Sequence, residues 1–269
     1  MRQSRIRASN PRRRVLQADL FDLSGRVAMV TGASSGLGSS IARALASGGA
    51  AVVLVARRES NLVKVRSEII NSRGQAEIVV ADLTNRGALR HYVNRASEPF
   101  GAPDILVSAA GVNPRKPILE VTTSEWDQTM KLNLDAPFFT AQMLAPEMIR
   151  RGWGRIINVA SLQSVRAFDD GAPYGASKAA IVQLTRAQAQ AWSRYGVNAN
   201  AIAPGFFATA LTSSLAGDPV RWSELANRTM TKRNGDPRDL WGTVLFLASR
   251  ASDYITGQTI FVDGGFTAG

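Results

Sequence analysis

The stretch VTGASSGLG, Val30 to Gly38, decides the fold. It begins at the end of an apolar run, Val27 to Val30, that has the length of a buried strand, and it leads into a helical pattern. Glycine between a strand and a helix permits a tight turn and a close approach of the backbone to a bound group. The N–H groups and the dipole of a helix N-terminus favour a phosphate there. The stretch therefore predicts a loop that holds a dinucleotide pyrophosphate.

The same alternation of strand and helix runs through the rest of the chain. Apolar, strand-sized runs are expected at 26–30, 51–56, 76–81, 104–108, 154–160, 197–203 and 258–262. Helical patterns are expected at 35–47, 60–72, 86–98, 124–150, 174–195 and 237–249. This order predicts an α/β fold: one Rossmann-like, doubly wound sheet of about seven parallel strands with helices on both faces. The catalytic domain is expected over 23–269, with an irregular lid segment at 205–236.

Composition excludes several classes of protein. The 269 residues include no cysteine, which excludes disulfides, thiol catalysis and Cys-ligated metals and fits a cytoplasmic location. Residues 1–14 hold six arginines and no acid, so more than half of the net charge of +11 belongs to a basic N-terminal arm, expected over 1–22. An organelle presequence has a similar composition. Without a nucleic-acid motif or a membrane-length apolar run, we expect no nucleic acid, no membrane and no metal as partner.

The residues after the second strand indicate the cofactor. In a dinucleotide site, an acid about 20 residues beyond the glycines binds the ribose hydroxyls of NAD. Here Arg57 and Arg58 follow the strand instead. A guanidinium binds a 2′-phosphate, which a carboxylate would repel. We therefore predict NADP(H) rather than NAD(H); the alternative is that both arginines are merely solvated. Asp82, at the end of the third strand, is placed to meet the adenine ring.

A second group of residues indicates the reaction. Tyr174 and Lys178 are four residues apart in YGASK, so a helix puts both side chains on one face. A nearby ammonium favours the phenolate and would lower the tyrosine pKa. Tyr174 can then exchange a proton with a carbonyl or alcohol oxygen, and Ser161, at the end of the fifth strand, can point at the same oxygen. A Tyr and a Lys that share a helix by chance are the alternative.

Together these motifs resemble the short-chain dehydrogenase/reductase family over about 23–267. TGASSGLG matches the family's TGxxxGxG, YGASK its YxxxK, and IAPGFFAT and TGQTIFVDGG its later motifs. The resemblance implies the catalytic residues Asn133, Ser161, Tyr174 and Lys178, with Asn133 holding a water in a proton relay to the lysine. It also implies that the lysine binds the nicotinamide ribose, and that the protein is a homotetramer or homodimer with 174–195 as its dimerising helix.

The residues expected to bind the cofactor lie in the glycine loop, at strand ends and in the family motifs. They are Gly32, Ser34, Ser35, Gly36, Leu37, Gly38, Arg57, Arg58, Asp82, Leu83, Gly111, Tyr174, Lys178, Pro204, Gly205, Phe207 and Thr209. One departure stands out, because the family's NNAG is here SAAG, with Ala109 in place of an asparagine. We expect the missing side-chain hydrogen bonds to be lost or supplied otherwise, with cofactor binding retained.

The substrate is indicated less sharply. Within the family the chain is most like the gluconate 5-dehydrogenase and 2-deoxygluconate dehydrogenase subgroup, through FDLSGR, GVNPRKPI, ASLQS and APGFFATALTSSLAGDP. Arg115 would pair with a sugar-acid carboxylate, or else face a neighbouring subunit; Gln163 would bond a substrate hydroxyl beside Ser161 and Tyr174. Asp169 and Asp170 would disfavour an anion if they face the pocket. The aromatic residues Phe206, Phe207 and Trp222 either wall the pocket or pack the lid.

The sequence is compatible with three functions. The first is an NADP(H)-dependent oxidoreductase that interconverts a secondary alcohol and a ketone of a sugar acid or polyol. The second is a 3-oxoacyl-thioester reductase, whose positive surface would dock an acidic carrier protein. The third is an NADP-binding sensor without turnover, which would not need both Tyr174 and Lys178.

Overall fold

A computed structural model describes residues 20–269. Seven parallel strands form one sheet in the order β3-β2-β1-β4-β5-β6-β7, which confirms the predicted fold class. The strands are β1 (Val27–Thr31), β2 (Ala51–Ala56), β3 (Gln75–Val80), β4 (Ile105–Ser108), β5 (Gly154–Val159), β6 (Val197–Pro204) and β7 (Thr259–Val262).

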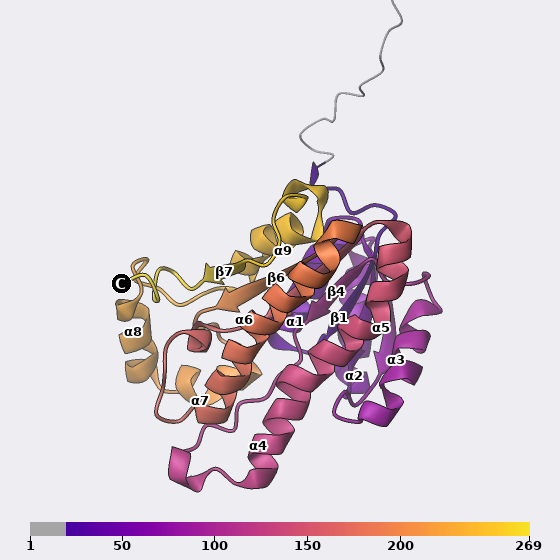
Figure 1. Cartoon of the computed structure of the whole chain (residues 1–269). Coiled ribbons are helices and arrows are strands. Elements are labelled where there is room, and N and C mark those ends of the chain that lie inside the picture. Colours follow the sequence, from indigo (N-terminus) through magenta and orange to yellow (C-terminus); the bar gives the residue numbers. More distant parts are fainter. Residues whose placement is uncertain (1–19) are drawn as a thin grey trace, which may run out of the picture.

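Helices cover both faces of the sheet (Figure 1). One face packs against α1 (Gly36–Ser47), α2 (Glu59–Asn71) and α9 (Trp241–Ala248). The other packs against α3 (Leu89–Ser97), α5 (Ala136–Arg151) and α6 (Ala172–Trp192). β1 shows why the sequence folds this way: Ala28 and Val30 enter the first core, and Val27 and Met29 the second. Successive side chains of a strand alternate between faces, so a strand between two helical layers is apolar throughout.

The strand order places a ligand site. It reverses between β1 and β4, where the chain moves first to one edge of the sheet and then to the other. In open α/β sheets, ligands bind in the crevice outside the carboxyl ends of the strands at this point. A Cβ at Gly32, after β1, would lie 2.7 Å from the Cα of Ala110, after β4. Only glycine lets the two loops meet so closely, which ties the glycine loop to the crevice.

In two segments the structure differs from what the sequence predicts. The helix expected at 124–150 is α4 (Thr123–Met130) and α5 joined by a π-helix, Lys131–Asp135, because one extra residue is inserted where Asn133 turns inward. The segment 205–236 was wrongly expected to be irregular, since it contains α7 (Ser213–Ala216) and α8 (Pro219–Arg228). Most of the expected arm, 1–22, lies outside the described residues.

Two features are absent from residues 20–269, a membrane-spanning helix and a cluster of metal-binding side chains. No helix in this range combines the length and apolarity of a membrane span. Within the same range, no three His, Asp or Glu side chains are gathered as a metal-ion site.

Candidate active site

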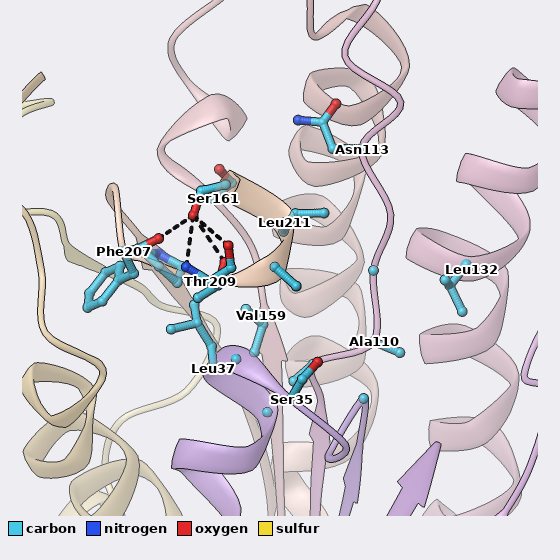
Figure 2. Close-up of a pocket in the computed structure, with 18 of the residues that line it drawn as sticks. Ser35, Leu37, Ala110, Asn113, Leu132, Val159, Ser161, Phe207, Thr209 and Leu211 are labelled. Atoms are coloured by element: carbon cyan, nitrogen blue, oxygen red, sulfur yellow. Dashed lines mark hydrogen bonds between the residues drawn. The ribbon is translucent and has the colours of Figure 1, made fainter. Parts of the chain in front are cut away.

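A cavity of about 430 Å³ opens at the carboxyl ends of the strands. The segments that follow β1 to β6 line it, together with Leu132 of the π-helix and Tyr174 of α6. Figure 2 shows Ser35 and Leu37 of the glycine loop on one side, near Thr209 and Leu211, with Ser161 and Asn113 further along the cavity. A Cβ at Gly36 would lie 3.3 Å from that of Thr209, so the start of the 205–236 segment rests on the glycine loop.

One end of the cavity is built for an anion. α1 begins after Ser35, whose hydroxyl makes no cap for the helix and instead accepts a hydrogen bond from Nη2 of Arg58 at 2.7 Å. The first N–H groups of a helix lack intrahelical partners, so they remain available to a ligand. A Cβ at Gly38 would stand 2.3 Å from the carbonyl oxygen of Gly32, so no larger residue fits this turn. These features fit a dinucleotide pyrophosphate.

Two charged residues stand beyond the anion end. Arg57 and Asp82 both line the cavity. Hydrogen bonds from the Thr84 hydroxyl and backbone N–H and the charge of Arg57 outweigh desolvation and hold the pKa of the Asp82 carboxyl below its usual value. Asp82 is therefore a carboxylate fixed by Thr84, and Arg57 and Arg58 bring two positive charges to this part of the cavity.

The reacting groups lie at the other end. Ser161 stands two residues after β5 and accepts a hydrogen bond through its Oγ from the N–H of Gln163 at 3.1 Å, which orients the hydroxyl. Tyr174 stands in the first turn of α6 and lines the same cavity. The Nζ of Lys178, one turn later, lies 5.6 Å from the centroid of the tyrosine ring and donates to the carbonyl of Val159 at 2.6 Å.

The pKa of Tyr174 differs from the expectation. Burial raises it above the ordinary value, and this outweighs the opposing effects of the Ser161 hydrogen bond and the Arg115 charge. The lowering expected from Lys178 is thus wrong for the protein in this state, because desolvation of the phenolate dominates. Burial also lowers the pKa of Lys178 to about 8, since its ammonium is almost fully removed from water.

Asn133 is placed behind the cavity rather than in its wall. Its Nδ2 donates to the carbonyl of Val112 and to the Oγ of Ser177, both at 3.0 Å, and its Oδ1 accepts from the N–H of Val112 at 2.9 Å. The side-chain amide is therefore occupied by protein groups, so it clamps the segment after β4 to α6.

The substrate end holds Arg115 and Gln163. The Nε of Arg115 and the Oε1 of Gln163 are buried and have no hydrogen-bond partner among the described residues. Nη1 of Arg115 lies 3.5 Å from Oδ2 of Asp170, whereas Lys116 turns away to pair with Glu125 at 2.7 Å. Oε1 of Gln163 faces the backbone of Gly171, where a Cβ would lie 2.4 Å from it. Both residues nevertheless line the cavity and bring polar side chains to this end of it.

The cavity brings together most of the predicted site residues. Only Asn133 and Lys178 do not line it; both lie behind Gly111, where a Cβ would be 3.4 Å from Oδ1 of Asn133 and 3.7 Å from Nζ of Lys178. Sequence reasoning missed several lining residues, of which Asn113 and Thr212 are polar. Asn113 stands two residues before Arg115 in a motif already singled out, which is a signal that could have found it.

The backbone at position 109, where the family has an asparagine, is bound by a side chain of β1. The Oγ1 of Thr31, at the end of β1, accepts hydrogen bonds from the N–H groups of Ala109 at 3.1 Å and Ala110 at 3.3 Å. These bonds hold the backbone of this segment, while the expected loss or replacement of the asparagine's side-chain bonds stays a prediction.

The aromatic residues of the 205–236 segment divide between the two expected fates. Phe206 and Phe207 line the cavity. Phe206 also packs edge-to-face on Phe266, with ring centroids 5.5 Å apart, and Trp222 joins this cluster without reaching the cavity.

Known proteins resemble this chain over nearly all of its described length. A family model described as enoyl-(acyl carrier protein) reductase matches residues 32–267. A gluconate 5-dehydrogenase of Gluconobacter oxydans is 41% identical over 93% of this chain and 97% of its own. A galactitol 2-dehydrogenase (L-tagatose-forming) of Cereibacter sphaeroides is 36% identical over 92% and 97%.

A solved structure extends the comparison to the fold and the cofactor. The gluconate 5-dehydrogenase of Burkholderia cenocepacia, crystallised with NADP and tartrate, is 40% identical and superimposes with a TM-score of 0.90 over 94% of this chain and 99% of its own. The matched family model, the relatives and the seven-stranded sheet agree. This chain belongs to the short-chain dehydrogenase/reductase family of oxidoreductases.

Proposed function

We propose that this protein is an NADP(H)-dependent oxidoreductase that interconverts a secondary alcohol and a ketone of a sugar acid or polyol, as a gluconate 5-dehydrogenase does. The observation that carries the proposal is the cavity itself. It joins an uncapped helix N-terminus flanked by Arg57 and Arg58 to a tyrosine and a serine, with Arg115 in the same lining. The relatives named gluconate 5-dehydrogenase support the substrate class.

The chain's own residues divide the chemistry. Bound NADP(H) supplies or takes the hydride. In reduction, Tyr174 donates its phenolic proton to the carbonyl oxygen, and in oxidation the phenolate takes the alcohol proton. Ser161 donates a hydrogen bond to the same oxygen and stabilises the charge that develops on it. Lys178 binds the nicotinamide ribose and places a positive charge behind the ring of Tyr174, which favours the phenolate when the proton leaves.

The remaining site residues hold the reactants. The glycine-loop residues hold the pyrophosphate, Arg57 and Arg58 the 2′-phosphate, and Asp82 and Leu83 the adenine. Gly111, Pro204, Gly205, Phe207 and Thr209 surround the nicotinamide half of the cofactor. Arg115 binds the substrate carboxylate and Gln163 a hydroxyl, since both side chains line the cavity. The protein is proposed to act in the cytoplasm as a homotetramer or homodimer, which light scattering after size-exclusion chromatography would test.

The test is a rate measurement at the nicotinamide absorbance. 5-Ketogluconate with NADPH and gluconate with NADP⁺ should turn over, and Tyr174→Phe should lower kcat by about 10³-fold or more while NADPH affinity stays within about twofold. Tyr195→Phe, an exposed tyrosine at the far end of α6, is the matched control and should retain activity. Undiminished turnover by Tyr174→Phe would contradict the assigned mechanism.

A 3-oxoacyl-thioester reductase is the second candidate. A solved structure named 3-oxoacyl (acyl-carrier-protein) reductase, from Agrobacterium tumefaciens with NADP bound, is 33% identical to this chain with a TM-score of 0.89 and favours this candidate. Turnover of a 3-oxoacyl thioester together with inertness toward every sugar acid and polyol would replace the first proposal with this one.

A further inference from the structure

An ion pair stands at the substrate end of the cavity. Nη1 of Arg115 lies 3.5 Å from Oδ2 of Asp170, and the two side chains are 16% and 24% exposed. The contact is longer than the 2.7–2.9 Å of a charge-assisted hydrogen bond. Asp170 therefore compensates the charge of Arg115 but does not occupy its donors, and the buried Nε stays without a partner among residues 20–269.

The backbone holds Arg115 in this place. Its φ is +48°, in the left-handed region that a non-glycine residue rarely adopts. The Oδ1 of Asn113 accepts a hydrogen bond from the Arg115 N–H at 3.2 Å and secures the turn. Strained backbone of this kind persists where the surroundings fix it, and it often accompanies a functional side chain.

Asp170 stands behind Arg115 rather than in the cavity wall. The charged residues that line the cavity are Arg57, Arg58, Asp82 and Arg115, and the first three belong to the cofactor end. Asp170 therefore sets one negative charge beside the positive charge that Arg115 brings to the substrate end. A carboxylate bound at Arg115 would therefore feel the repulsion of Asp170, whereas an uncharged polyol would not.

We propose that Asp170 is a positioning residue that sets the charge preference for substrate: it compensates Arg115, so that the cavity accepts neutral polyols beside sugar acids and binds the acids less tightly than Arg115 alone would. This rests on the proposed function only in its choice of substrates. The charge effect itself concerns any hydroxy acid that reaches Arg115.

The first experiment measures binding and needs no turnover. Calorimetry follows tartrate, a dihydroxy dicarboxylate, and threitol, its neutral counterpart, binding to the full-length protein saturated with NADP⁺. Asp170→Asn should bind tartrate about tenfold more tightly than the wild type, because the nearby negative charge is gone. Its affinity for threitol should change less than about twofold. A general loss of structure would weaken the binding of both ligands and would not strengthen the binding of tartrate alone.

The chain offers a matched control in the neighbouring residue. Asp169 is exposed and makes no ion pair within the described part of the chain, so Asp169→Asn removes the same charge without touching Arg115. It should leave tartrate affinity unchanged. Equal effects of the two variants, weaker tartrate binding by Asp170→Asn, or no tartrate binding by either wild type or Asp170→Asn would each overturn the proposal.

A double-mutant cycle shows whether Asp170 acts through Arg115. In an Arg115→Gln background, Asp170→Asn should change tartrate affinity less than about twofold. A tenfold tightening that survives there would refute the coupling.

Turnover links the result to the substrate. Gluconate and glucitol differ only in carrying a carboxylate or a CH₂OH at C1, so the ratio of their kcat/KM values reports charge preference, and Asp170→Asn should raise it about tenfold through KM. If the wild type turns over neither compound, the proposed function fails, while the tartrate measurement still decides the charge effect.

Discussion

At the level of single residues, the active site holds a buried ammonium with little around it to compensate the charge. Lys178 is 4% exposed, and its Nζ has one hydrogen-bond acceptor, the carbonyl of Val159. Burial lowers its pKa to about 8. An ammonium kept in such a place for chemistry destabilises the protein without its ligands, as strained active sites commonly do.

Replacing this lysine should therefore stabilise the cofactor-free protein. Lys178→Met removes the desolvated charge but leaves the Val159 carbonyl unpaired, so we expect a net gain of about 1–2 kcal/mol in the free energy of unfolding at pH 7. Below a pH of about 8 the lysine is protonated in both folded and unfolded states, and the gain is complete. As the pH rises from there toward the ordinary lysine pKa, the folded lysine loses its proton first and the gain shrinks.

Urea unfolding from pH 6 to pH 10 measures this effect. Lys64→Met, at an exposed position of α2, is the control and should show no such pH dependence. A Lys178→Met variant less stable than the wild type at pH 7 would contradict the account.

At the level of elements, the ends of β1 and β4 are joined by one hydroxyl. Thr31 is 3% exposed, and its Oγ1 accepts hydrogen bonds from the backbone N–H groups of Ala109 and Ala110. These groups lie at the switch point of the sheet, where Ala109 and Ala110 line the cavity. The contact that joins the ends of β1 and β4 therefore also fixes this part of the cavity wall.

Thr31→Val keeps the shape of this side chain and removes the hydroxyl. We expect a loss of about 1–2 kcal/mol in the free energy of unfolding, because two partly buried N–H groups lose their acceptor. Thr31→Ser retains the acceptor and should be less damaging than Thr31→Val. The ranking is read from urea midpoints, and a valine variant as stable as the wild type would show that the N–H groups find another acceptor.

At the level of the whole molecule, the bound cofactor should stabilise the folded state, because the segments that follow six of the strands line its site. A ligand that binds only the folded state stabilises it by about 2.7 kcal/mol at a concentration of 100 times Kd. NADP⁺ at that excess should therefore raise Tm by about 5–10 °C. NAD⁺ at the same concentration should raise it less, since it lacks the phosphate that Arg57 and Arg58 would bind.

Substitution of Arg57 tests the source of this difference by the same thermal measurement. Arg57→Ala should reduce the advantage of NADP⁺, and Arg57→Asp should reverse it, because the new carboxylate repels the 2′-phosphate and can bind ribose hydroxyls. An unaltered NADP⁺ response in Arg57→Asp would assign the preference to Arg58 or to neither arginine.

The strands, the glycine loop and YGASK could all be read from the sequence, for a common physical reason. Hydrophobic period, turn glycine and helical spacing are local properties, so a few neighbouring residues express them. The order of strand and helix then leaves few topologies, and the carboxyl edge of the sheet gathers residues such as Ser161 and Arg57 that are far apart along the chain.

What the sequence could not reveal depends on pairs of distant residues and on burial. The contacts of Arg115 with Asp170, of Asn133 with Val112 and of Thr31 with Ala109 exist only once the segments after the strands have packed. The pKa of Tyr174 moved opposite to the expectation because desolvation belongs to the folded environment and not to the spacing of a motif. Local sequence motifs therefore determined the type of reaction, whereas tertiary packing determined which charges lie at the substrate end.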